Sequence, residues 1–179
     1  GTFGLAVRPV AESELAGVGA KHEVVFVSHK ADLKTASRTN VSAVLVDPNT
    51  SFTVVAYDPA GAELGRKTIS SATLVHWQES LGPIVGEKDV PLGRVSFEVA
   101  SGRIAVYDSV VDNVTNDGFV IQGVPSTQAR SQWLLAGMSR APGERNTFWT
   151  SDVWVHNPQA TAIQVTFTPW LAGLVAVAG

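Results

Sequence analysis

The sequence predicts an all-β fold, an antiparallel β-sandwich with one complete repeat followed by a partial second repeat. Three observations lead to this prediction. Apolar and polar residues alternate with a period of two, which is the pattern of a half-buried strand. Short apolar runs are separated by turns rich in Pro, Gly and Asn, at the spacing that is typical of a sandwich. A motif also recurs after about 110 residues, which is the length of a whole domain.

The apolar runs define the expected strands in chain order. Four runs are apolar on both faces and rich in β-branched residues, as central strands are: residues 23–28, 41–46, 52–57 and 104–111. Another strand is expected where Val95, Phe97 and Val99 alternate with polar residues, and a short one at residues 119–121. We therefore expect about seven or eight strands between Lys21 and Pro125.

Turn signals separate these runs. Asp47-Pro48-Asn49 and residues 58–61 each follow an apolar run, and Ser101-Gly102 joins two strands as a hairpin. The connector between Trp77 and Val90 has no strand pattern. We expect it to contain a helical turn near residues 78–81.

An internal repeat sets the expected domain boundaries. Ser28 and Ser139 are 139 − 28 = 111 positions apart, and Thr39 and Thr150 are separated by the same interval. The first nine residues also resemble the strand that ends the complete repeat. We therefore predict three parts: a last-strand-like segment at 1–9, a complete sandwich repeat at 10–126, and the first half of a second repeat at 127–179.

The partial repeat is expected to expose an apolar face, because the second half of its sandwich does not follow. That face is then covered by further repeats, by the complete repeat, by another copy of the chain, or by a strand donated from a neighbour. The expected interface residues are Trp133, Trp149, Trp154, Val165, Phe167 and Trp170.

Several strand-and-turn motifs resemble a known type of repeat. They include Arg38-Thr39-Asn40, Tyr57-Asp58-Pro59-Ala60-Gly61, Asp112-Asn113 with Thr115-Asn116-Asp117, and Ala141-Pro142-Gly143 with Asn157-Pro158. Together they resemble a tandem Ig-like β-sandwich repeat of large secreted bacterial proteins. The resemblance implies an Ig-like fold and an extracellular, non-catalytic role, and it supplies no catalytic residues.

The residue types that carry catalysis form no recognisable constellation. His22, His29, His76 and His156 stand in no catalytic signature, and the carboxylates are dispersed. The chain has no cysteine, which excludes disulfides, thiolate metal sites and cysteine nucleophiles. We therefore expect no enzymatic activity and no cofactor.

One loop has the composition of a calcium site. Asp108, Asp112, Asn113, Asn116 and Asp117 offer the oxygen atoms that calcium prefers. The same composition is typical of a tight turn, in which Asx side chains bond nearby backbone N–H groups. We favour the turn and predict no metal site, but the sequence leaves calcium binding by this loop open.

The charge and hydropathy patterns exclude two kinds of partner. The formal net charge is −3 and the Lys and Arg residues are scattered, so no basic stripe is available for nucleic acid. The apolar tail at residues 170–179 is shorter than the ~20 residues that span a bilayer, so we expect no membrane span.

The sequence favours a mechanical role over a chemical one. We expect a structural or adhesive module that is secreted or lies at a bacterial cell surface, as a subunit of a fibre or filament completed by strand pairing between copies. The alternative is a carbohydrate-binding module appended to a secreted enzyme. Its aromatic platform would draw on Trp77, Trp133, Trp149, Trp154 and Trp170.

Overall fold

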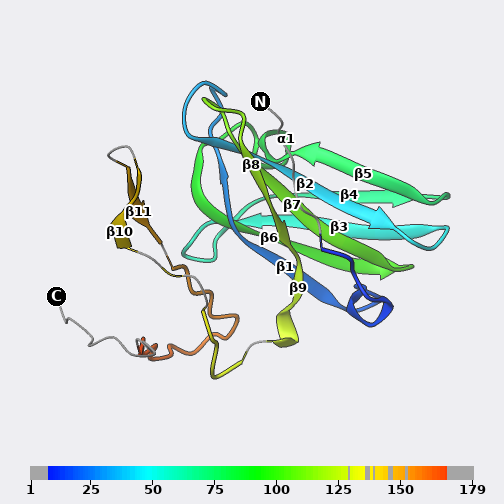
Figure 1. Cartoon of the computed structure of the whole chain (residues 1–179). Helices are drawn as coiled ribbons and strands as arrows, with labels where there is room; N and C mark the ends of the chain where they lie inside the picture. The colour runs from blue at the N-terminus through cyan, green and yellow to red at the C-terminus, as the bar shows by residue number, and fades with distance from the viewer. Residues whose placement is uncertain are drawn as a thin grey trace. The chain divides into compact units, whose positions relative to one another are not determined.

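Two antiparallel sheets face each other in the first part of the chain (Figure 1). One sheet has the strand order β4-β3-β6-β1-β9, and the other has the order β5-β2-β7-β8. The computed structural model describes residues 8–128, 130–135, 138, 140–144, 147–151 and 153–168. It separates into two units, Gly1–Met138 and Ser139–Gly179, and both sheets belong to the first unit.

The five-stranded sheet contains β4 (Glu63–Ser71), β3 (Thr50–Tyr57), β6 (Val90–Ser101), β1 (Lys21–His29) and β9 (Val124–Pro125). The four-stranded sheet contains β5 (Val75–Ser80), β2 (Ser37–Leu45), β7 (Ile104–Asp112) and β8 (Gly118–Gln122). The short helices of this unit are η1 (Glu12–Glu14), α1 (Leu81–Val85) and η2 (Ser126–Gln128). The described residues of the second unit contain one two-stranded sheet, formed by β10 (Arg140–Pro142) and β11 (Phe148–Thr150).

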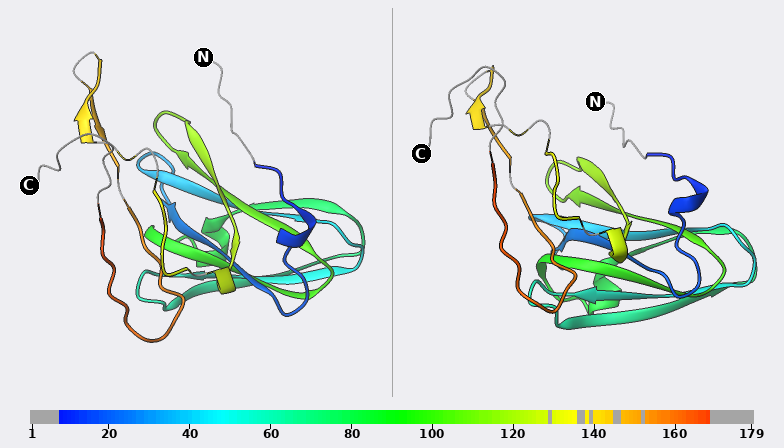
Figure 2. Two further views of the ribbon diagram at one scale, coloured as in Figure 1. Left: turned by 60° about the horizontal axis from the view of Figure 1, so that its bottom comes forward. Right: turned by 90° about the horizontal axis from the view of Figure 1, so that it is seen from below.

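The predicted all-β, antiparallel sandwich is confirmed, and its two layers can be followed in Figure 2. The four runs that are apolar on both faces lie in β1, β2, β3 and β7. The alternating run around Phe97 lies in β6, and the hairpin expected at Ser101-Gly102 joins β6 to β7. The strands therefore form where their side chains can be buried between the layers.

The strand count and the connector differ from the expectation. Nine strands, β1 to β9, lie between Lys21 and Pro125. The extra strands come from β4 and β5, which are sheet edges with one neighbour each and therefore carry polar residues that weaken the apolar pattern. Trp77 lies within β5, and the helix begins only at Leu81, where the Ser80 Oγ accepts the Gly82 N–H at 3.4 Å.

The facing layers bury a continuous apolar core. Phe52 on β3 is fully buried, and its ring centroid lies 6.2 Å from that of Phe97 on β6. Trp77 on β5 meets Phe52 edge-on at 5.6 Å, so a strand of the opposite sheet closes this part of the core. Trp77 therefore packs against the core of the first unit. It is not available for an exposed aromatic platform.

A bulge interrupts β1 at Phe26. The register between β1 and β6 shifts between Val25 and Val27, and the φ angle of Phe26 is 72°. This left-handed conformation is uncommon for a bulky residue.

Charged side chains anchor the hairpin between β6 and β7. Arg103, which lies in this turn, donates two hydrogen bonds to the Asp47 carboxylate, at 2.8 Å and 2.9 Å, and one to Glu12 at 2.7 Å. The hydrogen bonds from Arg103 lower the pKa of Asp47, and those to both carboxylates raise the pKa of Arg103. The hairpin is thereby fixed to the turn between β2 and β3 and to η1.

Candidate interaction surface

The residues predicted to form an interface are exposed wherever the structure describes their side chains. Trp133 is 68% exposed and Phe167 is 60% exposed. Trp149 lies in β11, but its side chain is outside the described part of the structure, and Trp170 is outside the described residues altogether. The exposed and described members of the set are Trp133, Trp154, Val165 and Phe167. Contact between these residues and a partner stays a prediction.

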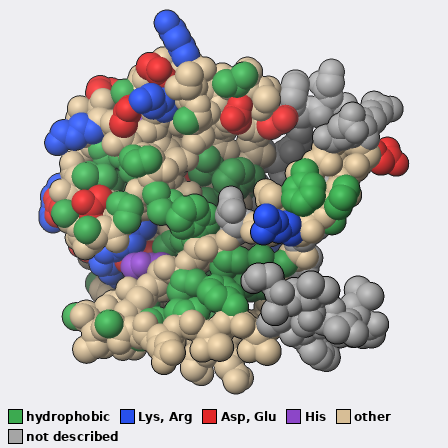
Figure 3. All heavy atoms as spheres, turned by 90° about the vertical axis from the view of Figure 1, so that its left-hand side faces the viewer, with side chains coloured by type: hydrophobic (Ala, Val, Ile, Leu, Met, Phe, Trp, Pro, Cys, Tyr) green, Lys and Arg blue, Asp and Glu red, His purple; other side chains and the backbone are tan. Residues whose placement is uncertain are grey.

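No strand is formed by the described residues between 153 and 168. Ile163, Val165 and Phe167 alternate with polar residues, a pattern that predicts a strand here, and this prediction is wrong for the described backbone. A strand is stable only when a neighbouring strand takes up its backbone N–H and C=O groups. Without such a neighbour, the apolar side chains reach the surface, and Figure 3 shows one face of the molecule where hydrophobic side chains lie among polar ones.

The described residues of the second unit form one hairpin. Arg140 pairs with Thr150, and the Gly143 N–H donates to the Thr147 carbonyl at 2.8 Å, which closes the β10–β11 hairpin. Counting back 111 positions places this hairpin on the connection between β1 and β2. A different pair of residues is bonded there, because the Lys30 N–H donates to the Ser37 carbonyl at 2.8 Å.

The turn expected at Asn157-Pro158 is also formed. The Asn157 side chain accepts the Gln159 N–H at 3.1 Å and donates to the Thr161 carbonyl at 2.7 Å. Its counterpart in the first unit is the turn at Asp47-Pro48, where the Thr50 Oγ1 donates to the Asp47 carbonyl at 2.6 Å. The second unit thus has the local turns of a sandwich without its sheets.

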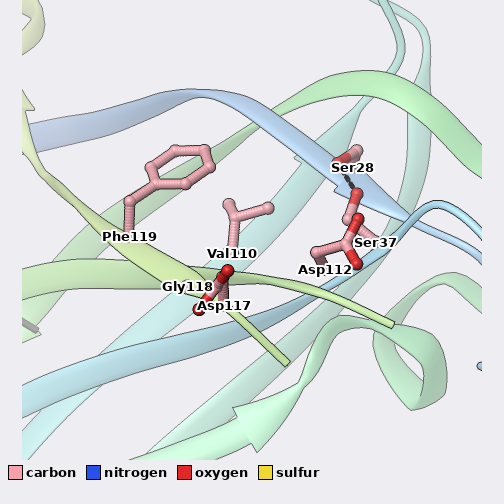
Figure 4. Close-up of a pocket in the computed structure, with 7 residues that line it drawn as sticks. All are labelled: Ser28, Ser37, Val110, Asp112, Asp117, Gly118 and Phe119. Carbon is pink, nitrogen blue, oxygen red and sulfur yellow. Dashed lines mark hydrogen bonds between the residues drawn. The ribbon is translucent and has the colours of Figure 1, made fainter. Parts of the chain in front are cut away.

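A shallow cavity of about 320 Å³ opens in the first unit between β1, β2, β7 and β8 (Figure 4). Phe119 lies on one side of it, and Ser28 and Ser37, whose hydroxyls are hydrogen-bonded to each other, lie on the other. The remaining lining residues are Val110, Asp112, Asp117 and Gly118. The lining contains no histidine, lysine or arginine, and the carboxylate of its Asp112 is held by the N–H groups of Val114 and Thr115.

The candidate calcium loop is explained by turn chemistry. Asp112 Oδ1 accepts the N–H groups of Val114 and Thr115 at 2.9 Å and 2.7 Å, and these bonds lower the pKa of Asp112. Asn113 bonds Arg38 and the Thr35 carbonyl. Among the residues that the structure describes, no three His, Asp or Glu side chains come together as a metal site.

Asp108 lies apart from that loop, in the core of the first unit. It lies on the same, inward face of β7 as Ile104, Val106 and Val110, and it is fully buried. No donor reaches either carboxylate oxygen with hydrogen-bond geometry. Burial raises the pKa of Asp108 well above its ordinary value, and the nearby Ser42 backbone N–H opposes this shift only in part. The period-two pattern of β7 already places this residue inward, although the sequence analysis assigned it to the loop.

The histidines are dispersed over the first unit and the chain beyond it. His22 and His29 are buried on β1, and desolvation lowers the pKa of each. Neither ring nitrogen of His29 has a hydrogen-bond partner, so no hydroxyl is activated by it. His76 Nε2 is 2.7 Å from the Tyr107 hydroxyl on the outer face of the four-stranded sheet. His156 belongs to the second unit. His22 and His29 thus stand at the two ends of β1, both of them buried.

Comparison of the chain with protein-family models, with curated proteins and with solved structures finds no match. Within the described residues, no helix has the length and apolar character that crossing a bilayer requires. The class that the fold defines is thus an antiparallel β-sandwich, followed in the chain by a second unit whose described residues form one two-stranded sheet.

Proposed function

We propose that the chain is a non-catalytic structural or adhesive module made of tandem Ig-like sandwiches, secreted or displayed at a bacterial cell surface. Its partial second repeat is completed by strand pairing with other repeats or other copies, as in a fibre or filament. One observation carries the proposal: the large apolar side chains of Trp133, Leu135, Val155, Ile163, Val165 and Phe167 are exposed, although the sandwich of the first unit buries a continuous apolar core.

The energetics of burial support this role. Covering an apolar side chain of the size of Val, Leu or Phe contributes about 1.5–3 kcal/mol. Trp133, Ile163, Val165 and Phe167 are each at least 45% exposed, so a partner that covers them gains the burial energy of several side chains at once. Open backbone groups beside them offer strand pairing as the mode of recognition.

Light scattering across a concentration series, together with electron microscopy, tests the proposal. We expect the native chain to assemble, and we expect Val155→Asp to reduce assembly because a carboxylate is costly to bury. Val18→Asp is the matched control, since Val18 is an exposed valine of the first unit. A chain that stays monomeric at all concentrations, with and without its native partners, contradicts the proposal.

A carbohydrate-binding module is the second candidate, because the side chains of Trp133 and Trp154 are exposed. This role predicts retention of the intact chain on insoluble polysaccharide. Retention should fall when Trp154 is replaced by Ala, and further in the double variant with Trp149→Ala. An intact chain that elutes with a non-binding control protein rules this candidate out.

A further inference from the structure

The two outer faces of the sandwich in the first unit differ in chemistry. On the five-stranded sheet, the outward Lys21 ammonium lies 3.8 Å from the Glu23 carboxylate and 3.9 Å from that of Glu98. Arg94 donates to Glu23 at 2.6 Å, and its guanidinium carbon lies 3.9 Å from the ring centroid of Tyr57. Ion pairs and a cation–π contact thus occupy the central strands of this face.

The outer face of the four-stranded sheet carries amide, hydroxyl and aromatic side chains instead. Val44 on β2 is 37% exposed, whereas Ala43 and Leu45 on either side of it are buried, so the even positions of β2 point outward. Residues directly opposite each other in antiparallel strands share a face, so the register identifies the other outward residues. We call this surface the amide face, and its polar and aromatic members include Asn40, Ser42, His76, Gln78, Tyr107 and Gln122.

The centre of the amide face lacks ion pairs of this kind. Three rows of cross-strand partners pass through positions 40, 42 and 44 of β2, and they contain no Lys, Arg, Asp or Glu. In the next row, Arg38 donates to Asn113 Oδ1 at 2.9 Å near the end of the sheet. At the β8 edge, Arg8 donates to Gln122 Oε1 at 2.8 Å and is paired with Glu14 at 2.9 Å. The charges are therefore confined to the rim, where each has a bonding partner.

Two aromatic rings form a flat surface on the amide face. The Tyr107 hydroxyl is hydrogen-bonded to His76 Nε2 at 2.7 Å, and the two ring planes differ by only 5°. Both bonded atoms lie in the planes of their rings, so these planes are no more than 2.7 Å apart. Carbon atoms of rings stacked face to face would be about 3.5 Å apart. The rings of Tyr107 and His76 therefore lie side by side and extend one plane.

Amide groups flank this aromatic surface. Gln78 and Gln122 belong to the same cross-strand row as Tyr107, which spans four strands, or about 14 Å at the usual strand spacing. Gln78 Oε1 accepts from Ser42 Oγ at 3.5 Å, and Asn40 Nδ2 donates to Ser109 Oγ at 3.3 Å. A side-chain amide has two N–H donors and two acceptor lone pairs, so each of these contacts uses a fraction of its capacity.

We propose that the amide face is a binding site for a neutral polysaccharide. A pyranose ring has an apolar C–H face that packs on an aromatic plane, and its hydroxyls donate and accept hydrogen bonds as side-chain amides do. A second sandwich packed on this face would bury the amides without such partners, which is costly. The inference goes beyond the proposed function, because the site lies within the first unit and does not depend on assembly. It also uses none of the tryptophans.

Native electrophoresis of the full chain, in gels that contain a soluble polysaccharide, tests this site. The neutral polymers are a β-glucan, a galactomannan and a glucomannan, and alginate is the anionic comparison. We expect at least one neutral polymer to slow the chain and alginate to leave it unchanged. Tyr107→Ala should weaken the binding by at least about tenfold, because it removes the larger ring of the aromatic surface.

The other tyrosine of the chain provides the matched control. Tyr57 lies on the outer face of the five-stranded sheet, so Tyr57→Ala should leave the binding of the polymer unchanged. Gln78→Ala is a second variant on the edge strand β5, and it should also weaken binding. It keeps the test decisive if Tyr107→Ala fails to fold, which circular dichroism of each variant shows.

The possible outcomes are distinct from those for the proposed function. Binding of a neutral polymer that depends on Tyr107 or Gln78, but not on Tyr57, supports the inference. Binding of alginate alone, of no polymer, or equally by folded Tyr107→Ala and Gln78→Ala overturns it. A dimer that Tyr107→Ala abolishes, in a chain that binds no polymer, assigns the face to a second copy and also overturns it. Assembly of the native chain without polysaccharide is measured separately, and its failure would leave this inference standing.

Discussion

Asp108 stands where a sandwich strand ordinarily carries an apolar residue. Its cross-strand neighbours are Val41 on β2 and Ile121 on β8, and neither provides a charge or a hydrogen bond. Asp112, at the end of the same strand, is exposed to hydrogen-bond donors instead. Three donors at the β7–β8 turn bind its carboxylate. Two carboxyl groups on the same strand therefore have pKa values shifted in opposite directions. Burial raises the pKa of Asp108, and hydrogen bonds lower the pKa of Asp112.

Replacing Asp108 by Asn should make the fold less sensitive to rising pH. In the wild type the carboxyl is neutral in both states below its ordinary pKa of about 3.9. As the pH rises toward the raised folded pKa, the unfolded chain releases the proton first, so stability falls by about 1.4 kcal/mol for each unit of the shift. The stability difference between Asp108→Asn and wild type should therefore grow in favour of the variant as the pH rises above about 4, until the folded carboxyl also ionises.

Urea unfolding of both proteins at each pH measures this difference in the free energy of unfolding. The contributions of the other carboxylates cancel in the difference, because both proteins contain them. Asp112→Asn serves as the control of opposite sign, since the pKa of Asp112 is lowered and its contribution is lost as the pH falls. A constant difference between Asp108→Asn and wild type across the range would show that Asp108 is not buried as the structure has it.

At the scale of elements, helix α1 depends on a glycine of β4. A Cβ atom at Gly65 would stand 2.0 Å from the carbonyl oxygen of Ile84, which belongs to α1. The helix buries Leu81, Ile84 and Val85, and it ends at Gly86 in the left-handed conformation. The absence of a side chain at Gly65 is therefore what lets a one-turn helix close the end of the core.

Gly65→Ala should destabilise the first unit by about 1–3 kcal/mol, because the helix backbone must move to admit the methyl group. Gly17→Ala is the matched control, since its Cβ would meet only Arg103 Cγ at 3.8 Å, and its effect should stay within about 0.5 kcal/mol. Chemical denaturation followed by circular dichroism measures both. Equal stabilities of the two variants would show that α1 does not pack on β4 as described.

The sequence predicts the central strands well and the edges poorly, for a physical reason. β2 and β7 have neighbours on both sides and face the core, so their apolar residues stand out against the turns. β4 has one neighbour and is mostly polar, and α1 is a single turn set by Ser80 and Gly86. The alternation in β7 is enough to predict the inward position of Asp108. The absence of a strand at residues 161–168 cannot be predicted in this way, because a strand forms only where the order of strands in space gives it a neighbour.

For the whole molecule, the strand order makes the sandwich depend on contacts between distant parts of the chain. β6 lies between β3 and β1 in one sheet, and β7 lies between β2 and β8 in the other. The pairing of β1 with β6 is long-range, as in Lys21 with Glu98, so the two sheets are complete only when the β6–β7 hairpin is in place.

Amide hydrogen exchange in the isolated chain should distinguish the paired strands of the first unit from residues 153–168. The amides of β2 and β7 lie in paired strands and open only with the whole sandwich, which costs about 5 kcal/mol or more in a typical domain. They should therefore exchange on the order of a thousandfold more slowly than those of residues 153–168, which form no strand in the structure.

Assembly should then protect the second repeat selectively. We expect residues 153–155 and 161–168 to gain protection when the chain is concentrated or given its partner, and β2 and β7 to change little because they are already paired. Mass spectrometry of proteolytic fragments, before and after assembly, follows both regions in one sample. Slow exchange at residues 161–168 in a dilute monomer would mean that the chain itself covers Ile163, Val165 and Phe167, and this segment would then need no partner.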